Sequence, residues 1–166
     1  HVDTTTPNWD LVSTCTIDGK RGILLVEAKA HEKELNEESH EKRLKADATN
    51  DSKKNHEKIG LAIQHANDSI KKSGFDISIS RDNCYQLSNR VAHAWWLANQ
   101  GIPVVLMYLG FLDCQDMNDG KNKLLNSPED WEDCFLKHAK QVGVNSIIDK
   151  WVDCGESKFI TISRSI

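Results

Sequence analysis

The sequence contains no apolar run long enough to cross a membrane. A membrane-spanning helix needs about 20 consecutive apolar residues, and the longest apolar stretch, residues 102–109 (IPVVLMYL), fits a buried β-strand instead. The start of the chain also lacks the basic, apolar and small-residue segments of a secretory signal peptide. We therefore expect a protein with no membrane partner.

An excess of positive charge is absent as well. The chain has 21 Lys and Arg against 25 Asp and Glu, which gives a net charge of −4. This balance argues against a protein that binds nucleic acid mainly by phosphate attraction. It still allows an enzyme that acts on phosphodiesters, because a bound cation reverses the charge locally.

The five cysteines form no C-x-x-C pair, and their number is odd. We expect free thiols in a reducing compartment, which favours a cytoplasmic protein. A zinc site built from Cys134 and His138 would need two further ligands that the sequence does not supply.

What the sequence does contain is a mixture of strand and helix patterns without repeats. Asp18-Gly19 is a strong hairpin signal between two predicted strands at residues 9–17 and 20–28. The run at 102–109 predicts a central strand covered on both faces, and residues 158–166 predict a last strand. The remaining predictions are helices at 54–72, at 84–100 with Asp82 or Asn83 as N-cap, and at 127–141, with a short helical turn at 147–152.

These elements predict an α/β fold, a small mixed sheet flanked by helices, in a single domain of 166 residues. Residues 31–58 are so rich in charge that we expect a solvated helix or a mobile surface segment. Residues 75–80 alternate in polarity and fit either a short edge strand or an extended loop. The first residues, HVDTTTPN, show no periodic pattern.

The tryptophans raise the question of base stacking. Trp95 and Trp96 are adjacent on a helix with a broad apolar side, so we expect at least one of them in the core. We expect Trp131 and Trp151 to pack the C-terminal helices onto the sheet.

The hairpin places three charged residues together. With a two-residue turn at 18 and 19, paired residues have numbers that sum to 37, so Asp10 is opposite Glu27, with β-carbons about 4.5–5.5 Å apart. Lys29 points to the same face as Glu27 because side chains alternate along a strand. Two facing carboxylates need protonation, the Lys29 cation or a divalent metal ion between them. From these residues alone, a solvated salt-bridged cluster and a metal site are equally acceptable.

Asp10, the strand pair and Glu27-Ala28-Lys29 resemble the PD-(D/E)xK nuclease superfamily, which includes restriction endonucleases and repair nucleases. In that family the E-x-K strand is followed by a helix and by a strand parallel to the first. The predicted helix at 84–100 and strand at 102–109 match this order. The resemblance covers residues 7–29 and 83–112 and implies a restriction-endonuclease-like core.

The resemblance also implies a set of roles. Asp10 and Glu27 would be ligands of Mg²⁺ or Mn²⁺, with the carbonyl of Ala28 as a third ligand. Lys29 would be the catalytic cation. Several branches place a Gln early in the following helix, and the matching Gln86 would orient water or phosphate.

Four features depart from the family pattern. One is a long helical insertion at residues 31–80, between the E-x-K strand and the helix with the Gln. The residue before Asp10 is Trp9 and not Pro, and Arg90 stands where branches with the Gln often have Tyr. Arg90 would contact a substrate phosphate or cap a carboxylate. The family's first strand, and its first helix with another acid, are not visible before Pro7. We expect both to belong to a missing N-terminal part, with Glu57 as a substitute for the acid.

Two classes of function follow, with a third and simpler alternative. The first is a divalent-metal-dependent hydrolase, an endonuclease or exonuclease that cuts DNA in preference to RNA. The second is a catalytically degenerate nuclease-like fold that binds nucleic acid or protein. In the third, the domain is only a stable part of a larger protein and the cluster is a salt bridge.

Overall fold

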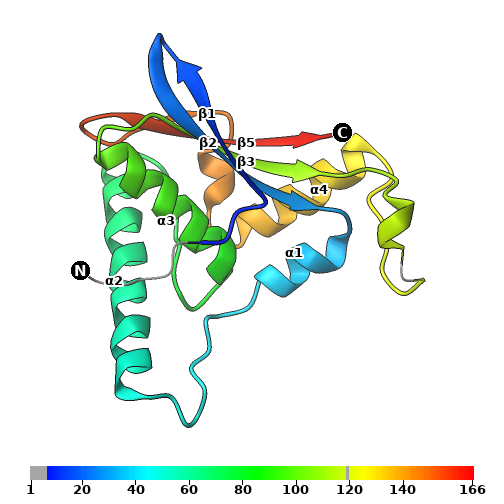
Figure 1. The fold of residues 1–166 in the computed structure, drawn as a ribbon, viewed down its shortest axis with the longest axis horizontal. Coiled ribbons are helices and arrows are strands. Elements are labelled where there is room, and N and C mark those ends of the chain that lie inside the picture. Colours follow the sequence, from blue (N-terminus) through cyan, green and yellow to red (C-terminus); the bar gives the residue numbers. More distant parts are fainter. Residues whose placement is uncertain (1–6, 119) are drawn as a thin grey trace.

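The computed structural model describes residues 7–118 and 120–166, and these form a five-stranded mixed β-sheet with four α-helices (Figure 1). The predicted α/β class is therefore confirmed. Residues 1–6, where the sequence shows no periodic pattern, lie outside the described residues. The strands are β1 (Leu11–Ile17), β2 (Lys20–Lys29), β3 (Val104–Gly110), β4 (Trp151–Asp153) and β5 (Lys158–Ser165). The α-helices are α1 (Glu32–Glu38), α2 (Asn50–Lys72), α3 (Tyr85–Asn99) and α4 (Pro128–Lys140), and two short 3-10 helices are η1 (Gln115–Met117) and η2 (Val144–Ser146).

The β1–β2 hairpin has the predicted register. Its pairs run from Leu11 with Val26 to Ile17 with Lys20. Asp18 and Gly19 both have positive φ angles, 50° and 76°, as a two-residue turn of this twist requires. The turn chemistry and the alternation of side chains are both local, so the sequence was sufficient to predict the pairing.

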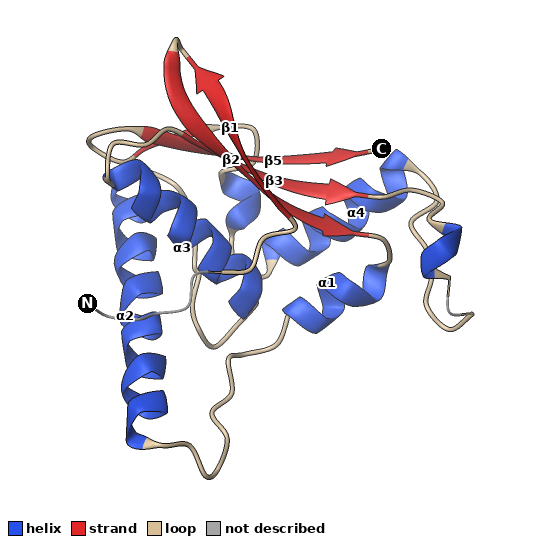
Figure 2. Ribbon diagram, viewed as in Figure 1, coloured by secondary structure: helices blue, strands red, loops and turns tan. Residues whose placement is uncertain are grey.

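The sheet order is β1-β2-β3-β5-β4, with β2, β3 and β5 mutually parallel and both edge strands antiparallel to their neighbours. The prediction that β3 is covered on both faces is wrong. Its residues 104, 106, 108 and 110 are buried, whereas Val105, Met107 and Leu109 are partly exposed. Figure 2 shows the reason, because the four helices all lie on one side of the sheet.

Helix α2 begins at Asn50, four residues before the predicted start, because the side chain of Thr49 caps it by accepting a hydrogen bond from the Ser52 amide at 3.2 Å. Its apolar face buries Ile63 and Ile70 against the core, as the helical spacing predicted.

Helix α3 has Cys84 at its N-cap, in a left-handed conformation with φ 43°. The prediction of Asp82 or Asn83 is therefore wrong. Asp82 instead accepts a hydrogen bond from Arg81, and the Asn83 amide donates to the carbonyl of Gln141, so both side chains are used elsewhere.

The C-terminal third is partly as expected. Ser127 caps α4 by accepting a hydrogen bond from the Asp130 amide at 3.1 Å. Trp131 is buried between α4 and the sheet, but Trp151 is 40% exposed, so its predicted packing role is wrong. The predicted helical turn at 147–152 is also wrong, because the short helix η2 lies before this range and β4 begins within it. Of the two alternatives for residues 75–80, the structure has the extended loop.

A close approach between β3 and α4 generates a stability prediction. A Cβ atom on Gly110 would lie 2.5 Å from Cδ2 of Trp131. We expect Gly110→Ala to lower the free energy of unfolding by about 1–3 kcal/mol, because a buried indole must move to admit the methyl group. Urea unfolding measures this change. In a Trp131→Leu background the same Ala should cost clearly less, and equal costs in both backgrounds would contradict the contact.

Candidate active site

Strand β2 delivers Glu27 and Lys29 to the face of the sheet that the helices cover. The two side chains are only 4% and 8% exposed, and Lys29 Nζ lies 2.5 Å from Glu27 Oε1. On β3, directly opposite Glu27, stands the fully buried Tyr108. The prediction that Glu27 and Lys29 share a face is confirmed, and that face is interior.

Helix α3 contributes Arg90. Its Nε and Nη2 atoms lie 2.8 Å and 2.5 Å from Oε2 of Glu27, and its Nη1 donates to Oε1 of Gln86 at 3.2 Å. Gln86 and Arg90 are one turn apart, so the helix itself brings them together. Of the two roles that the sequence allowed for Arg90, the structure has it on a carboxylate. Each oxygen of Glu27 therefore has its own cation.

Helix α1 contributes a second buried acid, Glu38, which the sequence-based prediction missed. Its Oε1 lies 2.7 Å from Lys29 Nζ, and its Oε2 lies 3.4 Å from the Tyr108 hydroxyl and 3.6 Å from Nε2 of His138 on α4. The sequence does contain a signal for the burial of Glu38. Leu35 is the only apolar residue of α1, and Glu38, three positions later, lies on the same face of the helix.

The buried cluster thus pairs two acids, Glu27 and Glu38, with two cations, Lys29 and Arg90. Burial acts to lower the pKa of Lys29, but Glu38 and Glu27 outweigh it, and the pKa of Lys29 is raised. Burial acts to raise the pKa of Glu38, but the nearby His138 and the charges of Lys29 and Arg90 lower that pKa to about 2. At neutral pH the cluster therefore holds a protonated Lys29, which suits stabilisation of negative charge rather than removal of a proton.

Glu27 differs from Glu38 in its balance of forces. Burial raises the pKa of Glu27, while Arg90 and Lys29 oppose that rise. Its ionised form therefore depends on both cations staying in contact with it.

Asp10 lies beside the cluster rather than in it. Its side chain is exposed, and its Oδ2 accepts a hydrogen bond from the backbone amide of Ala28 at 2.7 Å. The N–H and C=O groups of one strand residue point to the same edge, so the Ala28 carbonyl also faces the Asp10 side of β2. The structure thus brings the Asp10 carboxylate to the backbone of Ala28 at the open end of the hairpin.

The oxygen donors at this place match Mg²⁺ or Mn²⁺ in type. Among residues 7–118 and 120–166, no group of three or more His, Cys, Asp or Glu side chains is arranged to hold a metal ion. Mg²⁺ needs only one or two carboxylates, because waters and substrate phosphates complete its shell. Asp10 and the Ala28 carbonyl would hold it, and Glu27 would join them only in competition with Arg90 and Lys29.

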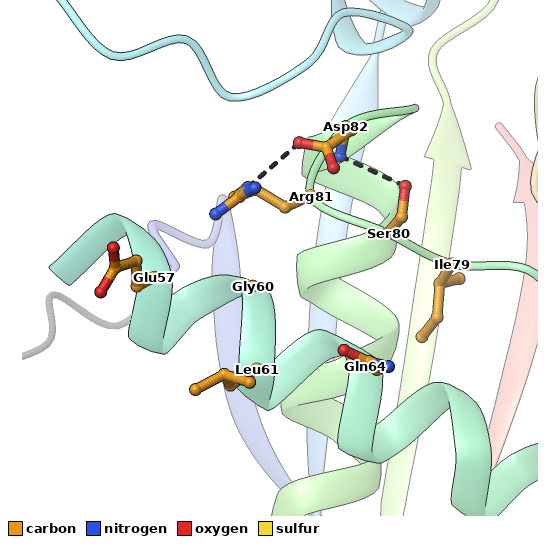
Figure 3. Close-up of a pocket in the computed structure, with 8 residues that line it drawn as sticks. All are labelled: Glu57, Gly60, Leu61, Gln64, Ile79, Ser80, Arg81 and Asp82. Atoms are coloured by element: carbon orange, nitrogen blue, oxygen red, sulfur yellow. Dashed lines mark hydrogen bonds and ion pairs between the residues drawn. The ribbon is translucent and has the colours of Figure 1, made fainter. Parts of the chain in front are cut away.

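Glu57 does not supply the missing acid. It is exposed on α2, at a cavity of about 480 Å³ that it lines together with Arg81 and Asp82 (Figure 3). The extra acid of the cluster is Glu38, so the expectation for Glu57 is wrong.

The five cysteines are all unpaired, as expected from their number. Cys134 and His138 form no metal group, since His138 is engaged by Glu38 and Ser39. In the described ranges, none of the helices has the length and apolarity required for a membrane span.

Comparison with models of protein families, with curated proteins and with solved structures found no match.

The low pKa of Glu38 predicts a pH dependence of stability. Its folded pKa of about 2 lies below the ordinary 4.5, so its contribution is present above pH 4.5 and is lost as the pH falls to 2. We expect Glu38→Gln to destabilise the protein at pH 7 by an amount on the order of 3 kcal/mol. The variant should also lose less stability than the wild type between pH 5 and pH 2.

Chemical denaturation at several pH values measures both effects. Glu37→Gln is the matched control, because Glu37 is the neighbouring acid, is exposed and has its carboxylate 3.6 Å from Lys33. Glu37→Gln should keep the wild-type pH dependence. If Glu38→Gln keeps it too, Glu38 does not carry the effect.

Proposed function

We propose that this protein is a divalent-metal-dependent nuclease that hydrolyses phosphodiester bonds in DNA, with a restriction-endonuclease-like core. The observation that carries the proposal is the end of β2, where Glu27 and Lys29 are buried side by side and Asp10 lies across the hairpin, bonded to the Ala28 amide. We also propose that it acts in the cytoplasm, which the unpaired cysteines support.

The energetics of the cluster favour a role beyond stability. Removing a charge from water costs several kcal/mol, and apolar residues of similar size often serve a fold as well as a buried ion pair does. A chain that keeps four charges at one strand end is a candidate for chemistry there. Asp10 is exposed to solvent, so a substrate would approach the cluster from its side.

The residues have distinct roles in this proposal. Asp10 and the Ala28 carbonyl hold the cation, with Glu27 as the third donor. The bound ion would lower the pKa of its water and polarise the scissile phosphate. Lys29 stabilises the negative charge that develops on the phosphate, and Gln86 orients water or phosphate at the exposed start of α3.

Arg90 has two roles in the proposed mechanism. It neutralises Glu27 when no substrate is present, at 2.8 Å from its Oε2. A phosphate that arrives near Asp10 is a competing anion for the same guanidinium, since Arg binds phosphate and carboxylate with the same fork of donors. Transfer of Arg90 from Glu27 to phosphate would free a carboxylate oxygen.

One observation favours a second function, a nuclease-like fold without catalysis that binds nucleic acid or protein. Both oxygens of Glu27 are already paired with cations, so the negative charge of Glu27 is neutralised without a metal ion. In that case metal ions would not bind, and Asp10 would serve only to fix the Ala28 amide.

Calorimetric titration of Mn²⁺ and a cleavage assay on mixed DNA substrates separate the two functions. For the nuclease we expect Mn²⁺ binding to the wild type, and we expect Asp10→Asn to abolish it. The same variant should lower the cleavage rate roughly a hundredfold or more, because it removes the exposed ligand. Asp10 is exposed, so the variant should keep its fold.

Asp116→Asn is the control, since Asp116 is an exposed acid in η1. It should keep both binding and cleavage. An absence of Mn²⁺ binding and of cleavage in the wild type would contradict the nuclease and leave the binding fold as the better proposal.

A further inference from the structure

A cavity of about 290 Å³ lies between helices α2 and α3. Ile59 and Ile63 of α2 and Ala92 of α3 form apolar parts of its lining, and aromatic side chains form much of the rest. Its size is near the lower limit for small-ligand pockets, so it suits a flat group rather than a bulky one.

Aromatic rings form a row along one side of this cavity. The ring centroids of Trp9 and His93 are 5.9 Å apart, and those of His93 and Trp96 are also 5.9 Å apart, with only 20° between the latter two planes. Burial lowers the pKa of His93, so its ring is neutral at pH 7 and stacks as an uncharged aromatic. The row ends at Trp96, which is 50% exposed.

Trp96 is therefore an indole with one face on His93 and half of its surface open. Its neighbour Trp95 is buried and donates a hydrogen bond to Ser69, as a core tryptophan should. The two tryptophans have different environments, and of the two, Trp96 has the open indole surface on which a ligand could stack.

The row leads directly to the candidate active site. The guanidinium carbon of Arg90 lies 5.5 Å from the Trp9 ring centroid, and Arg90 binds Glu27. A continuous series of contacts thus runs from Glu27 through Arg90, Trp9 and His93 to Trp96. A ligand that stacks on Trp96 would lie at one end of this series, and Glu27 lies at the other.

Polar groups around the cavity fit a nucleotide. Lys58 lines it, and Lys42 lies 4.5 Å over the ring of Tyr85, which also lines it. Asn89 supplies an amide that can both donate to and accept from a base edge. Cations beside stacking aromatics are the arrangement with which proteins hold single-stranded nucleic acid.

We propose that the cavity between α2 and α3 binds one unstacked base of a single-stranded nucleic acid, with Trp96 as the stacking residue. This inference rests on the proposed nuclease function and specifies its substrate class. A base inside a duplex is stacked on both faces and cannot enter the cavity. The substrate is therefore a single strand, or a duplex with an unpaired segment beside the cleavage position.

Binding without catalysis tests the inference. The anisotropy of a labelled, short single-stranded oligothymidylate is measured in EDTA and at low salt, with wild type, Trp96→Ala and Trp151→Ala. Trp151 is the matched control because it is a similarly exposed tryptophan on β4, at 40%. A stacked base contributes about 1–3 kcal/mol, so Trp96→Ala should weaken binding roughly tenfold, whereas Trp151→Ala should not.

A duplex of matched length is the second probe, and Trp96→Ala should not change its binding. No oligothymidylate binding by the wild type, or equal binding by wild type and Trp96→Ala, would overturn the inference. So would an equal loss in both tryptophan variants, because the effect would then not come from the cavity.

The outcomes of the binding and cleavage assays distinguish the base-binding site from the nuclease activity. Loss of binding in Trp96→Ala, without metal-dependent cleavage by the wild type, supports the base site and contradicts the nuclease. Cleavage that Trp96→Ala leaves unchanged, together with unchanged oligothymidylate binding, overturns the base site alone.

Discussion

The ion pairs between Glu27, Glu38, Lys29 and Arg90 are the interaction on which the arrangement of the other elements depends. They join β2 to α1 and α3, and Glu38 extends the connection to His138 on α4. Such a network adds little net stability, because the cost of removing water from each ion offsets the attraction. Its effect is to require a specific residue at each position, since the loss of one partner leaves a buried charge without compensation. The network therefore fixes how three helices sit on the sheet more than it strengthens their attachment.

The parts of this protein that the sequence predicts well are those set by short-range geometry. Asp18-Gly19 determines the hairpin and its register, and the alternation along β2 puts Glu27 and Lys29 on one face. Gln86 and Arg90 meet because they are one helical turn apart. In each case the responsible residues lie within a few positions of one another or across one tight turn.

The parts that the sequence does not predict depend on contacts between distant segments. Glu38 lies in a strongly charged run. Leu35 marks its face of α1, but the burial of Glu38 follows from where α1 rests against β2 and α4. The N-cap of α3 falls on Cys84 because Asn83 is engaged by Gln141, a residue of another helix end. The expected cover on the second face of β3 is absent from the described part of the chain for the same reason. An apolar strand sequence shows that both faces of the strand could be buried. The positions of the helices determine which face is buried in fact.

The wide separation of the cluster's members along the chain has a consequence for how the protein folds. Glu27 and Arg90 are 63 residues apart, and Glu38 and Tyr108 are 70 residues apart. The parallel pairings of β2 with β3 and of β3 with β5 likewise join remote segments. The loops between them must close before any of these contacts forms, so the chain should fold more slowly than a helical bundle of its length. The hairpin is held by local contacts, so we expect it to form first, with Glu27 and Lys29 hydrated until α1 and α3 pack against them. Water should then leave the charges only when all four are in place, because a buried charge without a partner costs several kcal/mol.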